Sequence, residues 1–277
     1  MKFILIFGGD LRNLHLYNKS VLNQKHVALT GFDRIDQKYV IEQSLIKKCD
    51  LLIGPIPLTT DGKTLYLPYS SSSMMIDAMI NKLSTNTRLV AGLGSIQIQN
   101  EHLIDITKNE EFYLKNIIPT VEGIIEIMIG KSDRTLHGSK TLILGFGRIG
   151  TRLSATLKAL GTNITLSTNS LEDEKRSYNL GYNHIQLNKL STSMLEYDFI
   201  INTIPSIYVN EKVIDQIPLS SILIDVASVP GGVDKEYADK TNHQLIVARG
   251  IPGKSSPRSV AEYMYEYLSQ EIKEFTE

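Results

Sequence analysis

Short apolar runs alternate with amphipathic stretches along the whole chain. Met75, Met79 and Leu83 are spaced by four residues, which is typical of one face of a helix. Short runs rich in Val, Ile, Leu and Phe lie between such stretches. In the first part of the chain they predict strands at residues 3–7, 27–30, 51–53, 89–91 and 103–106. This alternation is typical of α/β units built around a parallel sheet.

A second series of apolar runs begins after residue 140. It predicts strands at residues 141–144, 164–167, 185–187, 199–202, 222–226 and 245–248. Each series is long enough for one sheet, and a chain of 277 residues is long enough for two domains at about 150 residues each. We therefore predict an α/β protein with two Rossmann-like, doubly wound parallel-sheet domains, the second of which binds a dinucleotide.

Two amphipathic stretches flank the second series. Pro119 fits the first position of a helix, and apolar residues follow it with helical spacing up to Ile129. Near the C-terminus, Ser256 fits a helix cap, Pro257 a helix start, and Ala261 to Ile272 an apolar stripe able to pack back on the first domain. The predicted boundaries are 1–118 for a substrate-side domain, 119–133 for an interdomain helix, 134–254 for the dinucleotide-binding domain and 255–277 for the C-terminal helix.

Composition and charge exclude several classes of protein. Lys and Arg number 29 and Asp and Glu number 30, for a net charge of −1, which argues against nucleic-acid binding by phosphate neutralisation. One cysteine, Cys49, excludes an internal disulfide framework and a zinc site of several thiolates, and we expect no metal. No leader and no run of about 18 apolar residues is visible, so we expect a cytoplasmic protein without a membrane span.

The motif GFGRIG at residues 145–150 follows a strand run and opens a helical pattern. Its candidate cofactor-binding residues are Gly145, Phe146, Gly147, Arg148, Ile149 and Gly150. The first glycine allows a tight turn, the second lets backbone amides approach a pyrophosphate, and the third lets the helix pack close to the strand. A purely structural turn is the alternative. The context favours dinucleotide binding.

The end of the next predicted strand indicates which dinucleotide is bound. An NAD site normally has Asp or Glu there to hold the ribose 2′-hydroxyl. This chain has Ser167, Thr168 and Asn169 instead, and Arg176 or Lys175 one turn later could supply positive charge to a 2′-phosphate. NADP is therefore favoured over NAD. In the alternative interpretation, the two cations simply face solvent.

Polar and small residues also follow the fourth and fifth strands of the second series, where a nicotinamide ring would lie. Thr203, Ile204 and Pro205 follow the fourth strand, and Asp225, Val226 and Ala227 end the fifth. Ordinary turns are the alternative to a nicotinamide site at these positions.

The histidines argue against one class of dehydrogenase. His15 falls in the first predicted helix, and the other five lie at or just before the amino ends of predicted strands: His26, His102, His137, His184 and His243. Ligands bind at the carboxyl ends of parallel strands. An alcohol dehydrogenase with a histidine base is therefore disfavoured, and a substrate that loses its proton easily fits better.

Candidate substrate and catalytic residues follow the strands of the first domain and open the bridging helix. Arg12 could bind a substrate carboxylate bidentately, with Lys254 and Arg258 as competitors. The other candidates are Thr59, Thr60, Thr120 and Glu122. Arg12 could equally be solvated, and Glu122 could be a first-turn acid that favours the helix dipole instead of a base.

Eight segments, in this order along the chain, resemble the A subunits of dipicolinate synthase. They are FGGDLR at 7–12, GFD at 31–33, IPTVEG at 118–123, LHGSK at 136–140, GFGRIG at 145–150, INTIPS at 201–206, LIDVASVPGGVD at 223–234 and GIPGKSSP at 250–257. The chain departs from the family pattern at Asn169, where Arg is expected, at Arg249, where Pro is usual, and at Pro57, which replaces a small hydroxyl residue.

The resemblance implies oxidation of dihydrodipicolinate, or its hydrated precursor, to dipicolinate (pyridine-2,6-dicarboxylate) with NADP. It implies that the activity occurs in the mother cell during sporulation and that the chain works together with a flavoprotein-like B subunit. Assembly of the chain into a homo-oligomer is a further possibility. Arg12 would then supply a cation for the substrate carboxylates, and Thr59, Thr60 and Thr120 would supply hydroxyl donors. The alternatives are another NAD(P)-dependent small-acid dehydrogenase and a non-catalytic nucleotide-binding partner subunit.

Overall fold

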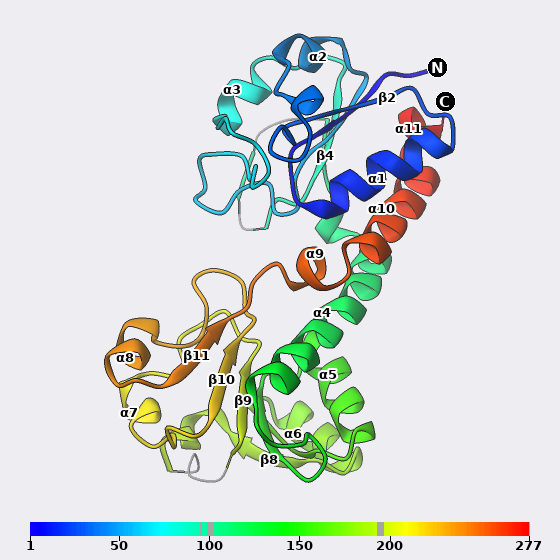
Figure 1. Ribbon diagram of the computed structural model, residues 1–277. Helices are drawn as coiled ribbons and strands as arrows, with labels where there is room; N and C mark the ends of the chain where they lie inside the picture. Colours follow the sequence, from blue (N-terminus) through cyan, green and yellow to red (C-terminus); the bar gives the residue numbers. More distant parts are fainter. Residues whose placement is uncertain (95, 99–101, 193–196, 277) are drawn as a thin grey trace. The chain divides into compact units, whose positions relative to one another are not determined.

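The computed structural model describes residues 1–94, 96–98, 102–192 and 197–276. The chain forms two compact units (Figure 1). The first comprises Met1–Pro119 and Pro252–Glu277, and the second comprises Thr120–Ile251. The second unit thus ends at Ile251, before the boundary predicted at residue 254.

The first unit contains a five-stranded parallel sheet in the order β2-β1-β3-β4-β5. Its strands are β1 (Ile4–Phe7), β2 (Val27–Thr30), β3 (Leu51–Ile53), β4 (Arg88–Ala91) and β5 (Leu103–Asp105). Its helices are α1 (Leu11–Leu22), α2 (Gln43–Lys48), α3 (Ile76–Ile80), α9 (Ile251–Ser255), α10 (Pro257–Glu271) and α11 (Lys273–Thr276), with 3₁₀ turns at η1 (Gln37–Tyr39) and η2 (Ile106–Lys108). All five strand predictions are confirmed.

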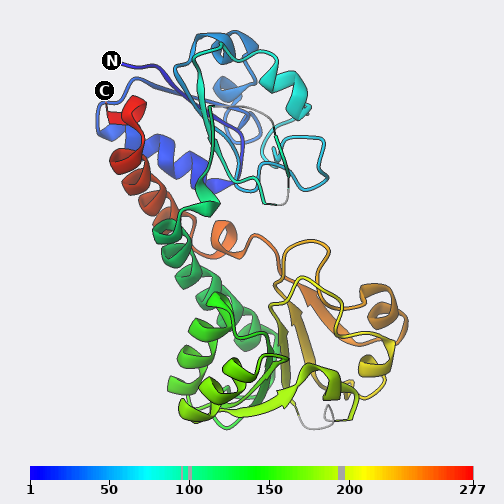
Figure 2. The ribbon, with the colours of Figure 1, turned by 180° about the vertical axis from the view of Figure 1, so that it is seen from behind.

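Two hydrophobic cores cover the two faces of this sheet, because successive side chains of a strand point to opposite faces. Ile4 and Ile6 of β1 belong to a core that includes Leu16 of α1 and Met264 of α10. Leu5 and its alternate neighbours on β1 belong to the other core, which α2 and α3 cover. Both views show α10 alongside α1 (Figures 1 and 2). Helix α10 thus packs on α1 and on one face of the first sheet.

One of the two predicted helix starts is wrong. Helix α4 (Glu110–Lys131) begins well before Pro119, which lies inside it. The helix starts early because Asn109 accepts a hydrogen bond from the Phe112 amide at 2.8 Å and Phe112 is buried in the core. Pro119 therefore removes one internal helix hydrogen bond instead of occupying the first turn. Ser256 precedes α10 as predicted, but its side chain makes no capping hydrogen bond.

The second unit contains a six-stranded parallel sheet in the order β11-β10-β9-β6-β7-β8. Its strands are β6 (Lys140–Leu144), β7 (Asn163–Thr168), β8 (Asn183–Gln186), β9 (Phe199–Asn202), β10 (Ile222–Asp225) and β11 (Gln244–Val247). Its helices after α4 are α5 (Arg148–Ala159), α6 (Leu171–Asn179), η3 (Leu187–Thr192), α7 (Glu211–Ile214) and α8 (Lys235–Lys240). Strands β7 and β8 are added to one side of β6, and β9, β10 and β11 are added to its other side. Because crossovers between parallel strands are right-handed, α5 and α6 lie on one face of the sheet and α7 and α8 on the other (Figure 1).

Both units are therefore Rossmann-like, doubly wound parallel sheets, as the sequence predicted. Within the described ranges, no helix combines the length and apolar character needed to cross a membrane.

Candidate functional site

The glycine loop of the second unit has the geometry that its sequence predicted. Gly145 has a φ of +95°, a conformation that side chains rarely adopt. A Cβ at Gly150 would lie 2.2 Å from the Gly145 carbonyl oxygen, so only glycine lets α5 approach the end of β6 this closely. A Cβ at Gly147 would meet nothing within 4 Å, so the loop is open on that side. Gly145 thus allows the turn, Gly147 leaves one side of the loop open, and Gly150 allows the close contact between helix and strand.

The amino end of α5 is available to an anion. Gly147 is its N-cap residue and supplies no side-chain capping hydrogen bond to the first amides of the helix. Such amides and the helix dipole favour a phosphate group at a helix N-terminus. Arg148, the first residue of the helix, is exposed, and Ile149 is partly buried. The residues present therefore fit the pyrophosphate of a dinucleotide.

The carboxyl end of β7 lacks a carboxylate in the structure as in the sequence. Ser167 and Thr168 are buried, and Asn169 is exposed just beyond the strand. The Ser167 hydroxyl has no hydrogen-bond partner among the described residues, and the Thr168 hydroxyl lies 3.2 Å from Nε2 of His184. The exposed group at this end of the strand is therefore the amide of Asn169, and no carboxylate follows the strand directly.

Arg176 has defined contacts although it is exposed to solvent. Its guanidinium lies 4.2 Å from the ring centroid of Phe146, and Nη2 donates a hydrogen bond to the Thr151 hydroxyl at 2.9 Å. Asp173 is 3.7 Å from Nη1. These contacts connect α6 to the glycine loop and hold one positive charge beside it. Lys175, the other cation considered, is exposed.

The polar residues after β9 and β10 form a structural clamp that the sequence did not reveal. Asp225 is buried, and its Oδ1 accepts hydrogen bonds from Asn202 Nδ2 at 2.7 Å and from the Ala227 amide at 3.2 Å. Its Oδ2 accepts one from the Gly232 amide at 3.1 Å. Asn202 Nδ2 also donates to the Ile204 carbonyl at 2.9 Å. The sequence did not indicate that Asn202 and Gly232 pair with Asp225, because residues far apart in the sequence make the clamp.

Other candidates at this edge surround the clamp. The Thr203 hydroxyl donates to the Leu144 carbonyl at 2.8 Å, which fixes the segment after β9 to the end of β6. Pro205 is exposed and Val226 is partly buried. The clamp holds the ends of β9 and β10 in one shape next to the glycine loop, because β6 and β9 are paired neighbours.

In the first unit, the strand order places the switch point of the sheet between β1 and β3, where ligands bind in such folds. Arg12 lies there, buried, on the first turn of α1. Its Nε and Nη2 donate to the two carboxylate oxygens of Asp10, each at 2.8 Å, and Nη2 also donates to the Ile56 carbonyl. Arg12 is therefore not solvated: it joins the loops after β1 and β3 and is already paired with a carboxylate.

The predicted threonine donors have different environments. The Thr59 hydroxyl donates to Asp61 at 2.8 Å and accepts from the Gly62 amide at 3.0 Å, so it stabilises its own turn. Thr60 is exposed. Thr120 is partly buried and Glu122 is exposed, and both lie on α4 in the second unit. The competing cations lie in the first unit, where Lys254 is exposed and the side chain of Arg258 is 82% exposed.

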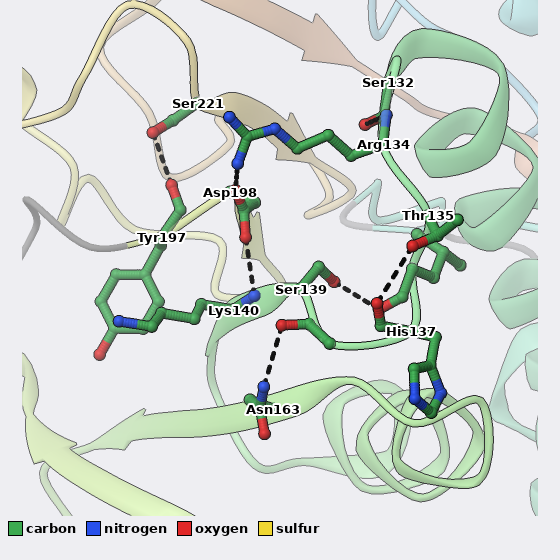
Figure 3. Close-up of polar contacts among 12 residues, drawn as sticks. Ser132, Arg134, Thr135, His137, Ser139, Lys140, Asn163, Tyr197, Asp198 and Ser221 are labelled. Atoms are coloured by element: carbon green, nitrogen blue, oxygen red, sulfur yellow. Dashed lines mark hydrogen bonds and ion pairs between the residues drawn. The ribbon is translucent and has the colours of Figure 1, made fainter.

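The amino edge of the second sheet is occupied by a structural network (Figure 3). Asp198 accepts hydrogen bonds from the Lys140 amide at 2.8 Å and from Arg134 Nη1 at 3.3 Å. His137 lies in the turn before β6, as predicted. Four others lie at or just before the amino ends of strands: His26, His102, His184 and His243. The predicted position at amino strand ends is confirmed for these five residues, although the side chain of His184 reaches Thr168 at the carboxyl end of the neighbouring strand β7.

Comparison with known proteins agrees with this geometry. Residues 3–118 match the N-terminal domain of the dipicolinate synthase A subunit, and residues 127–230 match the NAD binding domain of D-isomer specific 2-hydroxyacid dehydrogenases. The chain is 28% identical to the dipicolinate synthase A subunit of Bacillus subtilis (strain 168), over 98% of this chain and 96% of that protein.

Solved structures show the same similarity. The dipicolinate synthase A subunit from Bacillus halodurans has a TM-score of 0.88 and 26% identity, covering 97% of each chain. Its counterpart from Bacillus subtilis has a TM-score of 0.81 and 27% identity, covering 99% of this chain and 97% of that one. A Salmonella D-lactate dehydrogenase shares the fold alone, with a TM-score of 0.59, 13% identity and coverage of 96% of each chain. The chain therefore resembles the A subunits of dipicolinate synthase along its whole length, and its second unit is a nicotinamide-dinucleotide-binding domain of the dehydrogenase type.

Proposed function

We propose that this chain is the NADP-dependent oxidoreductase subunit that oxidises dihydrodipicolinate, or its hydrated precursor, to dipicolinate. The observation that carries the proposal is the open glycine loop at the amino end of α5, in a chain similar to a dipicolinate synthase A subunit over 98% of its length. The proposed partner is a flavoprotein-like B subunit. The proposal also includes activity in the cytoplasm of the mother cell during sporulation.

Two features support NADP as the cofactor. No carboxylate follows β7, where an NAD enzyme normally binds the ribose 2′-hydroxyl. Asn169 is exposed at this strand end, and Arg176 is held over Phe146 beside the glycine loop. An amide donor and a guanidinium suit a 2′-phosphate, because charge-assisted hydrogen bonds to phosphate are strong.

The reaction needs little acid–base chemistry from the protein. A ring carbon of dihydrodipicolinate loses a hydride to NADP, and loss of one proton completes the aromatic pyridine ring. In this proposal the amides of α5 hold the pyrophosphate, and Arg12 and the exposed Thr60 of the first unit bind a substrate carboxylate. Thr120 and Glu122 of the second unit are the candidates for a further hydroxyl donor and for the proton acceptor. The positions of the five histidines at amino strand ends agree with a reaction that uses no histidine base.

An absorbance assay of NADPH formation tests the proposed function. Purified chain is mixed with NADP and enzymatically generated dihydrodipicolinate, with and without the flavoprotein-like subunit. We expect NADPH and dipicolinate to form in equal amounts. No turnover in either mixture, together with tight NADP binding, would indicate a non-catalytic nucleotide-binding subunit. Turnover of 2-hydroxy acids alone would indicate another small-acid dehydrogenase.

A further inference from the structure

A long loop crosses the carboxyl edge of the first sheet. Residues 54–75, here called the edge loop, connect β3 to α3 without a helix or strand of their own. Loops of this length are usually functional in compact domains. The Leu58 amide donates to the Gly92 carbonyl after β4 at 2.7 Å, and the Tyr66 carbonyl accepts from the Gly9 amide after β1 at 3.1 Å. The edge loop, which begins at the end of β3, is thus hydrogen-bonded to the segments after both neighbouring strands, β1 and β4.

A third attachment joins the edge loop to the end of β2. Asp33 is buried, and its carboxylate accepts hydrogen bonds from the Ser70 hydroxyl at 2.8 Å and from the Ser71 amide at 2.9 Å. The Ser71 hydroxyl also donates to it. The Arg34 amide donates to the Tyr69 carbonyl at 3.0 Å. Any ligand at the switch point of this sheet therefore meets a loop held in a defined shape.

Tyr66 of the edge loop lies against the loop that carries the Arg12–Asp10 pair, because its carbonyl accepts the hydrogen bond from the Gly9 amide at 3.1 Å. It is half-buried, and no described residue makes a hydrogen bond with its hydroxyl. Burial, and then the negative charge of Asp10, raise the pKa of Tyr66, while the positive charge of Arg12 lowers it. The net rise keeps the hydroxyl neutral and able to donate a hydrogen bond.

Arg12 by itself leaves an anionic substrate incompletely recognised. Asp10 neutralises its charge through two hydrogen bonds in a pair whose side chains are 4% and 12% exposed. A substrate carboxylate at this edge therefore gains little net charge from the pair and needs further donors. The Thr59 hydroxyl already donates to Asp61, so the edge loop has to supply a donor from elsewhere.

We propose that Tyr66 is a substrate-binding residue whose hydroxyl donates a hydrogen bond to a carboxylate of the substrate at the switch point of the first sheet. The proposal deepens the proposed function and rests on it for the identity of the substrate as a six-membered-ring dicarboxylate whose oxidation gives pyridine-2,6-dicarboxylate. It assigns to the edge loop the selection of substrates that carry a carboxylate, through a hydrogen-bond donor that carries no charge of its own.

Binding and turnover of a conservative variant test this proposal. The full chain with Tyr66→Phe is compared with the unchanged chain and with Tyr267→Phe. Tyr267 is a fair control because it is also a partly buried tyrosine of the first unit whose pKa is raised chiefly by burial, but it lies on α10 beside Phe112. Calorimetry measures the Kd for pyridine-2,6-dicarboxylate and for NADP, and thermal melting measures folding.

We expect Tyr66→Phe to raise the Kd for pyridine-2,6-dicarboxylate by about tenfold or more, as loss of a hydrogen bond to a charged group does. The Kd for NADP and the melting temperature should not change, and in turnover KM should rise with kcat nearly constant. Tyr267→Phe should alter none of these values. An unchanged Kd in Tyr66→Phe, or an equal rise in Tyr267→Phe, would overturn the proposal.

The same experiment separates the two proposals. If the unchanged chain oxidises dihydrodipicolinate but Tyr66→Phe keeps its Kd and KM, the function stands and the role of Tyr66 is wrong. If Tyr66→Phe weakens dicarboxylate binding but the unchanged chain oxidises nothing, the binding role stands and the proposed function fails. If the unchanged chain neither binds pyridine-2,6-dicarboxylate nor oxidises dihydrodipicolinate, both are overturned.

Discussion

Replacing Gly147 by valine separates cofactor binding from folding more cleanly than any other change in the glycine loop. Gly147 has φ −71° and ψ −163°, a conformation that valine adopts without strain. A Cβ there meets nothing within 4 Å, so the folded protein has room for the new side chain. By contrast, a Cβ at Gly150 would lie 2.2 Å from the Gly145 carbonyl oxygen and disturb the fold itself.

The two effects of Gly147→Val differ greatly in size. Glycine is a better helix N-cap than valine, and the loss costs about 1 kcal/mol of folding stability or less. The side chain would occupy the open face over the first amides of α5, where the pyrophosphate is proposed to bind. Loss of two hydrogen bonds to a charged group, at about 1.5–3 kcal/mol each, removes about 3–6 kcal/mol of binding. The Kd for NADP should therefore rise by about a hundredfold to ten-thousandfold.

Calorimetry with NADP, and urea unfolding of the same preparations, provide the assay. Gly130→Ala is the matched control, because Gly130 lies inside α4 in the same unit and a Cβ there also meets nothing within 4 Å. It should bind NADP normally and be slightly more stable, since alanine favours a helix interior. If Gly147→Val folds and binds NADP as tightly as the control, the loop does not hold the pyrophosphate.

Three further predictions concern other parts of the chain. Asn169→Asp should turn the preference from NADP toward NAD in calorimetry, because a carboxylate there binds a 2′-hydroxyl and repels a 2′-phosphate. In urea unfolding, Arg12→Ala should cost about 3 kcal/mol, because it leaves the Asp10 carboxylate, whose side chain is 12% exposed, with only the backbone amide of residue 12 as a donor. The exposed Arg258→Ala should change stability by about 0.5 kcal/mol or less. Hydrogen bonds, first from the Ser71 hydroxyl, lower the pKa of Asp33 to about 2. The ionised Asp33 therefore stabilises the fold above its unfolded pKa of 3.8, and this stabilisation is lost as the pH falls toward 2. Acid unfolding of Asp33→Asn should lack this loss.

Each of these predictions has an outcome that contradicts it. An unaltered ratio of NADP to NAD affinity in Asn169→Asp would show that the end of β7 does not contact the ribose. Equal stabilities of the two arginine variants would show that the Asp10 pair contributes nothing to folding. An acid-unfolding curve for Asp33→Asn with the same slope as that of the unchanged chain between about pH 4 and pH 2 would mean that Asp33 does not hold the edge loop.

The hydrophobic pattern by itself determined the two parallel sheets and the glycine loop. Strand runs and the spacing of Gly145, Gly147 and Gly150 are local features, and the roles of the glycines depend only on backbone conformation and on space next to the Cα. The sequence also predicted that five histidines lie at amino strand ends, because the chain direction of a strand fixes which end is the amino end. Ligands bind at the carboxyl ends of parallel strands.

Only the tertiary structure decided which groups are paired at the carboxyl edges. Arg12 bonds to Asp10 nearby but also to the Ile56 carbonyl, and Asn202 bonds to Asp225 from a neighbouring strand. Sequence spacing does not encode such contacts, because they depend on how strands are ordered in the sheet and on the path of the loops between them. The start of α4 before Pro119 has the same cause: burial of Phe112 in the core outweighs the preference of proline for a first helical turn.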